Sequence, residues 1–300
     1  MRLTALEQSY QRAERVTAEW ARSFYFASWF LPTAKRRAVF AIYDFCRYAD
    51  NLVDQRGGRP AERVAEDLTE LRSTVERIHA GESPADPRWL ALHDTFRRYP
   101  IPLPPLLELL EGVALDLGPV AMPDFPSLER YCRQVAGGVG LMIGPVLGVP
   151  GGDTDEAGIR VGIAMQLTNV LRDVREDLDH DRVYLPADEL RMWGISREDL
   201  EGRRMSFRLR GFLEFQVCRA REYFESAEQV AGYFPADGSR LTVSLMLRTY
   251  AGILDRIEQQ RYDVFQSRAS VPFGRKLVIL GRTVLRDRAS RRQRPHGAFT

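Results

Sequence analysis

The chain has 300 residues, of which 44% are hydrophobic and 28% are charged, and this composition excludes a largely disordered protein. The formal net charge of +2 favours neither nucleic-acid binding nor strong attraction to a membrane. Apolar runs such as residues 139–149 are much shorter than the roughly 18 residues of a spanning helix. We therefore expect a chain that does not cross a membrane, although it could lie against one.

Cysteine and histidine usage argues against a zinc-binding protein. The cysteines Cys46, Cys132 and Cys218 are far apart and form no metal-binding spacing. The four histidines do not cluster, so a zinc site is not expected. Because no signal peptide stands at its start, we expect the chain to be reduced and cytoplasmic.

Helical periodicity dominates the chain. Residues 33–54 carry an apolar stripe with spacings of 4, 3, 4 and 3 residues, which predicts a helix capped by Thr33. Turn-rich segments separate further helices, expected to about His79, from Glu156 to about Asp179, over about 205–233 and over about 239–260. No run of alternating strand residues is convincing. We predict one all-α domain over residues 1–281.

The final segment, residues 282–300, differs from the rest of the chain. It loses the apolar period and is rich in arginine. We expect a basic, disordered tail there. Contact of this tail with anionic lipid is the less favoured alternative.

Two of the expected helices carry a polar stripe that ends in two aspartates one helical turn apart. The stripes consist of Tyr43, Arg47, Asp50 and Asp54 in the first helix and of Gln166, Asn169, Asp173 and Asp177 in the second. On an exposed helix such a pair costs only a few tenths of a kcal/mol. Across a cleft at ~6 Å, each carboxylate pair repels by about 3 kcal/mol. A cation removes this penalty, and oxygen ligands without His or Cys favour Mg²⁺.

A solvated face is the ordinary interpretation of one such pair of aspartates. Two copies, each with an arginine close ahead of its first aspartate (Arg47 and Arg172), are harder to ascribe to chance. The amides of Gln166 and Asn169 lie within an apolar segment, where an unpaired amide is costly. They could be satisfied core residues, but beside Asp173 we prefer contact with a ligand or metal.

Three stretches of the chain resemble the signature blocks of the squalene/phytoene synthase family, the head-to-head prenyltransferases. They read "FCRYADNLVD", "YCRQVAGGVGLMIGPVLG" and "AMQLTNVLRDVREDLDHDRVYLP". The likeness extends from about Ser23 to Leu277, and "YDVFQSRASVP" is most similar to the bacterial phytoene synthase branch. The resemblance implies an all-α isoprenoid (terpenoid) synthase fold, a single helical bundle around a central cavity.

The resemblance also implies a role for individual residues. The metal ligands would be Asp50, Asp54, Asp173 and Asp177, which hold two or three Mg²⁺ ions through the substrate diphosphates. The diphosphate-binding residues would be Ser23, Arg47, Gln166, Asn169 and Arg172. The catalytic residues would be Tyr131 and Tyr250, near the reacting carbons, and Arg182 and Tyr184, in a flap "DRVYLP" over the cavity mouth. Ala21, Asn51 and Arg175 depart from the family pattern, and the first two leave the number of ligands open.

The implied reaction joins two geranylgeranyl diphosphates through a cyclopropyl (prephytoene) diphosphate to phytoene, with release of pyrophosphate, in carotenoid biosynthesis. The same chemistry on two farnesyl diphosphates would give dehydrosqualene, presqualene diphosphate or squalene. A more remote alternative is a non-catalytic helical protein that binds lipid or assists assembly.

Partners follow from the same resemblance. Prenyl diphosphates would be the substrates, with peripheral contact to a membrane, association with downstream carotenoid enzymes, and no nucleic acid. The glycines of "AGGVGLMIG" miss the GxGxxG spacing of a nucleotide site. We therefore expect close helix packing at these glycines and no use of NADPH.

Overall fold

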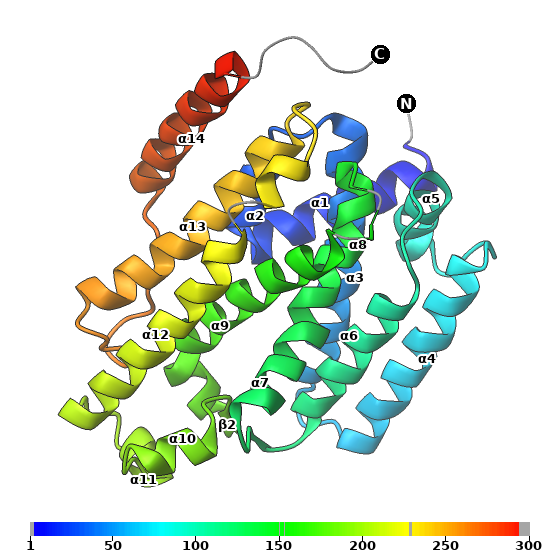
Figure 1. The fold of residues 1–300 in the computed structure, drawn as a ribbon. Helices are drawn as coiled ribbons and strands as arrows, with labels where there is room; N and C mark the ends of the chain where they lie inside the picture. The colour runs from blue at the N-terminus through cyan, green and yellow to red at the C-terminus, as the bar shows by residue number, and fades with distance from the viewer. Residues whose placement is uncertain (1–2, 150, 153, 228–229, 294–300) are drawn as a thin grey trace.

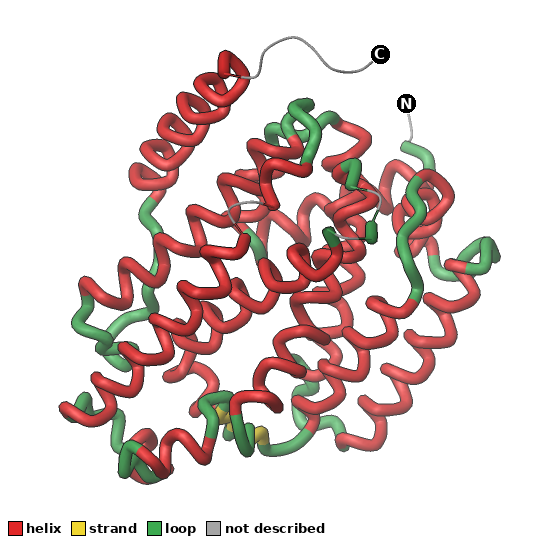
Figure 2. Tube along the Cα trace, viewed as in Figure 1, coloured by secondary structure: helices red, strands yellow, loops and turns green. Residues whose placement is uncertain are grey.

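The computed structural model describes residues 3–149, 151–152, 154–227 and 230–293, and nearly all of its regular structure is helical (Figure 1, Figure 2). The α-helices are α1 (Ala5–Trp20), α2 (Arg22–Ser28), α3 (Thr33–Asp54), α4 (Ala61–His79), α5 (Leu90–Arg98), α6 (Pro104–Ala114), α7 (Phe125–Cys132), α8 (Gly138–Leu147), α9 (Asp155–Asp179), α10 (Ala187–Met192), α11 (Arg197–Glu201), α12 (Phe207–Ala227), α13 (Ser239–Gln259) and α14 (Phe273–Gln293). Short 3₁₀ turns are η1 (Pro87–Trp89), η2 (Leu115–Leu117) and η4 (Val230–Tyr233), and η3 (Arg133–Gly137) is π-helical. The all-α prediction is confirmed.

Helix α3 has the range that its apolar stripe predicts. It spans Thr33–Asp54, but Pro32 occupies the N-cap and Thr33 is the first helical residue, so the predicted cap is one position off. Helices α4, α9 and α13 also end within a residue of the predicted limits. Of the helix expected over 205–233, the described residues include α12 over Phe207–Ala227 and the 3₁₀ turn η4 over Val230–Tyr233.

Helix α14 corrects the predicted start of a disordered tail. It extends to Gln293 and passes through position 282 without a break. Thr283 is only 3% exposed, and its hydroxyl donates to the carbonyl of Ile279. The inner face of the helix therefore continues past 282, and the arginines that obscure its period are themselves good helix formers. Residues 294–300 lie outside the described residues.

Helix α9 lies between two clusters of buried side chains. One cluster gathers residues of α9, α12 and α13, and the other gathers residues of α3, α4, α6 and α8. Val161 of α9 packs against both clusters. The two clusters therefore meet along α9, the helix that carries Asp173 and Asp177.

Close packing explains two glycines, Gly140 of α8 and Gly162 of α9. A Cβ atom on Gly140 would lie 2.8 Å from the carbonyl oxygen of Gly158. A Cβ atom on Gly162 would lie 2.4 Å from the carbonyl oxygen of Ala136. Backbone therefore meets backbone where α8 and η3 cross α9, as expected from the glycine-rich stretch.

Two glycines of α9 provide a matched test of this packing. Gly162→Ala should lower the free energy of unfolding by about 2 kcal/mol or more, because its Cβ would strike backbone atoms that cannot move alone. Gly158→Ala has nothing within 4 Å of the new Cβ, so it should be neutral or stabilise by about 0.5–1 kcal/mol. Urea denaturation of the two variants measures the difference. Equal stabilities would contradict the close approach.

A pair of two-residue strands anchors the segment that follows α9. Strand β1 (Val120–Ala121) pairs in parallel with β2 (Arg182–Val183). The amide of Ala187 then donates to the carbonyl of Met122. These bonds tie the predicted flap "DRVYLP" to the loop after η2. Two residues are too short a run to show the alternating pattern of a strand, so the sequence did not indicate them.

Candidate active site

A cavity of about 260 Å³ lies where α3 faces α9. It is lined by Arg47, Asp50, Val53, Asp54, Val113, Asp116, Tyr131, Val135, Gln166, Asn169, Val170, Arg172, Asp173, Asp177, Arg182 and Tyr184. Eleven of the thirteen predicted site residues are in this lining; Ser23 and Tyr250 are not. Two aspartate pairs more than a hundred residues apart in sequence therefore face one space, while the roles of the individual residues stay predictions.

The first aspartate pair is held among arginines. The guanidinium of Arg47 lies 3.8 Å from the carboxylate of Asp50 and 3.7 Å from that of Asp54. Arg182, from the flap, donates to Asp54 at 2.9 Å. The ring of Trp20 covers Arg47, with the guanidinium carbon 4.0 Å from the ring centroid. This cation–π contact fixes the direction in which Arg47 points.

The two aspartates of the second pair differ in their arginine partners. Asp173 accepts hydrogen bonds from Arg172 at 2.8 and 2.5 Å and from Arg268 at 2.7 and 3.0 Å. Burial acts to raise the pKa of Asp173, but these two arginines outweigh it, and the pKa lies below its usual value. For Asp177, burial and the charges of Asp173 and Asp116 raise the pKa to about 8.

Asp50 is the counterpart of Asp177 in the first pair. Burial, with added repulsion from Asp54 and Asp116, raises its pKa to about 7. The Asp50 side chain is 41% exposed, but it lines the confined cavity. Each pair thus has one aspartate with a close arginine partner and one whose negative charge is poorly compensated. A bound cation would supply the missing compensation.

The residues present fit a magnesium–diphosphate complex better than a metal bound by protein alone. Within the described ranges, no three His, Cys, Asp or Glu side chains are grouped closely enough to hold a metal ion. Mg²⁺ needs only one or two carboxylates when phosphates and water supply the rest. The buried Nε of Arg47 and Oδ1 of Asn169 have no hydrogen-bond partner in the structure. Both atoms belong to lining residues, so a donor and an acceptor remain for a ligand.

The raised pKa values predict how the stability of metal-free protein depends on pH. Asp50 and Asp177 have folded-state pKa values of about 7 and about 8, against an ordinary value of 3.8. The folded state therefore binds more protons than the unfolded state between these limits, and stability falls as pH rises through the window. The melting temperature should drop between about pH 5 and about pH 8.5. The double variant Asp50→Asn/Asp177→Asn should show a flatter profile, and an unchanged slope would contradict the assignment.

Asp116, at the centre of η2, is a lining residue that sequence reasoning missed. Its carboxylate accepts hydrogen bonds from the hydroxyl of Tyr184 at 2.7 Å and from that of Tyr131 at 2.9 Å. The two rings stack with centroids 5.0 Å apart. Burial raises the pKa of Asp116 and of both tyrosines. The only available signal was a single acid between the apolar residues of "ALDLG", which is too common a pattern to select.

Arg268 is a second functional candidate that was missed. It lies in the quoted stretch "YDVFQSRASVP", which carried the family resemblance but yielded no site residue. In the structure it contacts Asp173 as described above and lies 3.3 Å from Glu176. Since it is 95 positions from Asp173 in sequence, only the folded chain could reveal the pairing.

The remaining expected residues lie around the cavity. Tyr250, on α13, is close enough to Arg172 and Tyr43 to influence the pKa of each. It therefore lies near the part of the site that contains Arg172. Ser23 lies on α2 and does not line the cavity. Its role as a diphosphate contact stays a prediction. Arg175 donates to the carbonyl of Phe265 and so ties α9 to the loop after α13.

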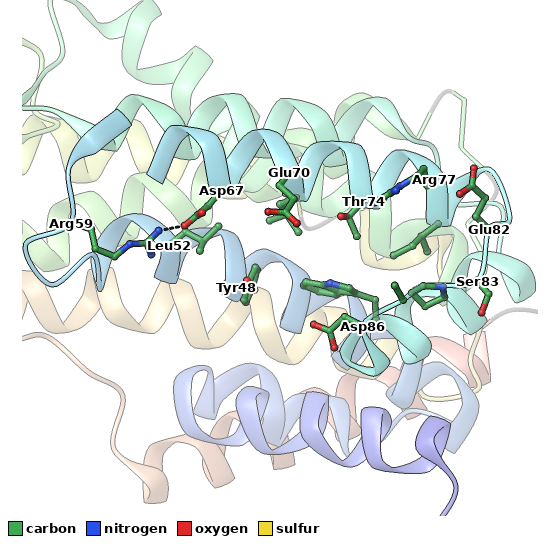
Figure 3. A pocket seen from close by; sticks show the side chains of 15 residues that line it. Tyr48, Leu52, Arg59, Asp67, Glu70, Thr74, Arg77, Glu82, Ser83 and Asp86 are labelled. Atoms are coloured by element: carbon green, nitrogen blue, oxygen red, sulfur yellow. Dashed lines mark hydrogen bonds and ion pairs between the residues drawn. The ribbon is translucent and has the colours of Figure 1, made fainter. Parts of the chain in front are cut away.

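A larger hollow, of about 430 Å³, lies between α3, α4 and the segment that leads to η1 (Figure 3). Tyr48 and Leu52 come from α3, but from a different face of the helix from Asp50 and Asp54. Arg59 and Asp67 form an ion pair in this hollow. None of the predicted site residues lines it. The larger hollow therefore has no part in the predicted site.

Comparisons with known proteins identify the family of the chain. The family model for squalene/phytoene synthase matches residues 17–275. A 15-cis-phytoene synthase of Synechococcus elongatus is 41% identical over 95% of each chain, and one of Synechocystis is 39% identical over 92% of this chain and 84% of its own. A crystal structure of a dehydrosqualene synthase superposes with a TM-score of 0.87 at 28% identity, covering 95% of this chain and 98% of that one.

The resemblance seen in three short stretches therefore extends over most of the chain and over its fold. The aspartate pairs, the flap and the glycine-rich crossing all fall within the matched residues. The chain belongs to the squalene/phytoene synthase family.

Proposed function

We propose that this protein is a prenyltransferase that condenses two molecules of geranylgeranyl diphosphate head to head and converts the cyclopropyl diphosphate intermediate to phytoene. The observation that carries the proposal is the single cavity lined by five aspartates and three arginines from segments far apart in sequence. Relatives named phytoene synthase, at about 40% identity over most of the chain, support the choice of reaction.

The arginines act on the diphosphate. Arg47, Arg172 and Arg182 line the cavity and are mostly buried, with side-chain exposures of 17%, 16% and 13%. Donors held in a confined, poorly hydrated space stabilise developing negative charge more strongly than donors in water. They would bind the diphosphate as its carbon–oxygen bond breaks and would keep the released pyrophosphate from recombining with the carbon.

Asp50, Asp54, Asp173 and Asp177 would hold magnesium together with the diphosphate. When bound, the metal would supply Lewis-acid charge neutralisation of the leaving group. The raised pKa values of Asp50 and Asp177 support this, because both carboxylates then gain a counterion. The existing arginine partners of Asp54 and Asp173 would orient these side chains.

The tyrosines act on the carbon skeleton. Burial keeps the hydroxyls of Tyr131 and Tyr184 neutral, and Asp116 holds both in place. Neutral aromatic faces stabilise a nearby cation by roughly 0.5–2 kcal/mol without reacting with it. Attack of the second substrate's double bond on the allylic cation forms a carbon–carbon bond and a new cation, and loss of a proton from that cation closes the cyclopropane. Loss of the second pyrophosphate, rearrangement and loss of a proton give the product.

One assay tests the proposal and its main alternative. Purified protein is incubated with Mg²⁺ and either labelled geranylgeranyl or labelled farnesyl diphosphate, with and without NADPH. We expect phytoene from the first substrate, no requirement for NADPH, and loss of turnover with EDTA. Dehydrosqualene from farnesyl diphosphate would instead favour the activity that the solved structural relative's title names. No product from either substrate would overturn the proposal.

The surroundings of the enzyme belong to the same proposal. We place it in the cytoplasm, in peripheral contact with the inner face of the membrane and in association with downstream carotenoid enzymes, because phytoene has no polar group and must leave for a non-aqueous phase. Co-sedimentation with membranes and pull-down of those enzymes would test the two contacts separately.

A further inference from the structure

Helix α14 presents a second apolar face in addition to the one that packs on α13. On the inner side, Thr283 is buried and Ile279 lies against Gly252 of α13. Figure 1 places α14 at the outer edge of the molecule. None of the helices in the described ranges combines the length and apolar composition that crossing a bilayer requires. The outer face of α14 carries apolar side chains that are exposed to solvent.

The outer face consists of apolar side chains and glycines. Leu277 and Val278 are each 46% exposed, and Leu285 is 67% exposed. At 100° per residue, these three side chains fall within an arc of about 100°, with the exposed Gly274 and Gly281 between them. Single exposed apolar residues are ordinary, but a continuous stripe that faces away from the core indicates a contact surface.

Positive charge borders this stripe. Residues 273–286 include four basic residues and no acidic one. Arg275 and Arg282 lie on the flank next to Val278 and Leu285, about 40–80° further around the helix. At the start of the helix, burial and the nearby Arg22 of α2 lower the pKa of Lys276, so a further positive charge stands close by. An apolar stripe with a cationic edge matches the interface of an anionic bilayer, where acyl chains lie beneath phosphates.

We propose that α14 docks this protein on the surface of an anionic membrane, with Leu277, Val278 and Leu285 entering the headgroup region and Arg275 and Arg282 contacting lipid phosphates. Charge favours a bilayer over a second copy of the chain. Pairing two copies through the same face would set one basic helix against another, since the sequence of α14 has seven basic residues and Asp287 as its single acid. Docking is independent of turnover, although its purpose rests on the proposed function, since prenyl diphosphates and their hydrocarbon product both partition into bilayers.

Flotation of the full chain with vesicles tests the proposal. The vesicles are phosphatidylcholine alone or phosphatidylcholine mixed with phosphatidylglycerol. We expect binding to the mixed vesicles, weakened at high salt. The variant Leu277→Gln/Val278→Gln/Leu285→Gln should lose at least about tenfold in binding, and Arg275→Gln and Arg282→Gln about fivefold each. Phe207→Gln is the matched control, because Phe207 is 91% exposed on α12 and should not affect binding.

Two further measurements separate the outcomes. Turnover in detergent and the melting temperature of all these variants should match the unmodified protein. The inactive Asp177→Asn variant should still bind vesicles, so failure of docking and failure of the proposed function are distinguishable. Absence of vesicle binding by the unmodified chain would overturn the proposal. Vesicle binding that the triple glutamine variant leaves intact would also overturn the proposal, even if that variant altered the oligomeric state.

A labelled variant gives an independent readout if the triple variant does not fold. Val278→Cys is made together with Cys218→Ser, because Cys46 and Cys132 are buried and Cys218 is exposed. A polarity-sensitive dye on position 278 should shift to the blue when mixed vesicles are added. The same dye on Phe207→Cys should not shift. A shift at 207 without one at 278 would overturn the proposal.

Discussion

Replacing Asp177 by asparagine should lower turnover by about 10³-fold while leaving the helical fold intact. The loss is expected because Asp177 would be a metal–diphosphate ligand, and an amide cannot provide the negative charge. It is also the aspartate of the second pair that lacks a close arginine, with a pKa raised to about 8. Steady-state turnover, with circular dichroism as the check on folding, measures the effect.

The same variant should not destabilise the metal-free protein. Above about pH 8 the folded state must keep the Asp177 carboxylate ionised against burial and against neighbouring acids, and an amide removes that cost. At about pH 8.5 the melting temperature of the metal-free variant should equal or exceed that of the unmodified protein. A residue that served only the structure would show the opposite sign.

Asp179→Asn is the matched control for Asp177→Asn. Asp179 lies two positions further along α9, but it is exposed and pairs with Arg203 outside the cavity. Its turnover should stay within about twofold of the unmodified protein, because exposed ion pairs contribute little. If Asp177→Asn retained more than half of the activity, the metal-binding role proposed for this aspartate would be wrong.

The Asp116→Ala variant should lose about 10²-fold in turnover, the scale expected when catalytic groups shift by about an ångström. The hydroxyls of Tyr131 and Tyr184 would lose their shared acceptor. Tyr131 keeps a hydrogen bond to the Tyr184 hydroxyl at 3.3 Å, whereas Tyr184 loses its acceptor, and an unpaired buried hydroxyl costs about 1–3 kcal/mol. Turnover and urea denaturation should both report the change. Glu111→Gln should leave both unchanged, because Glu111, five positions earlier and on α6, forms an exposed pair with Arg72.

A double-mutant cycle shows whether Asp116 acts through the tyrosines. Tyr184→Phe should lower turnover in the unmodified background, because it removes one of the two donors to Asp116. In the Asp116→Ala background it should have little additional effect, since the interaction is already lost. Additive losses would show that the carboxylate has a role apart from holding the tyrosines.

Local periodicity explains which parts of the fold could be predicted. The ranges of α3 and α9 follow from apolar residues repeated along one helix face, and that repeat is contained in the residues themselves. The tail boundary at 282 was wrong for a related reason. Its arginines hide an inner face that is recognisable only once Ile279 and Thr283 are seen against α13. The two-residue strands were too short to leave a pattern.

The residues of the candidate site also divide into those that the sequence could predict and those that it could not. The stripes ending in Asp50 and Asp54 and in Asp173 and Asp177 are properties of single helices, so spacing and the family resemblance identified them. Asp116 and Arg268 act through partners 15–95 positions away, and nothing in their immediate neighbours distinguishes them from ordinary charged residues.

By itself, the sequence determined that the protein is helical, that it carries two acidic helix faces and which family it resembles, because these depend on residue types at short, regular spacings. Only the tertiary structure decided which aspartate of each pair has an arginine partner and which is left with a raised pKa. Charge compensation and loss of solvent depend on distances between segments that chain order does not specify. The tertiary structure likewise decided that an apolar stripe of α14 faces outward, since burial is a property of the assembled bundle.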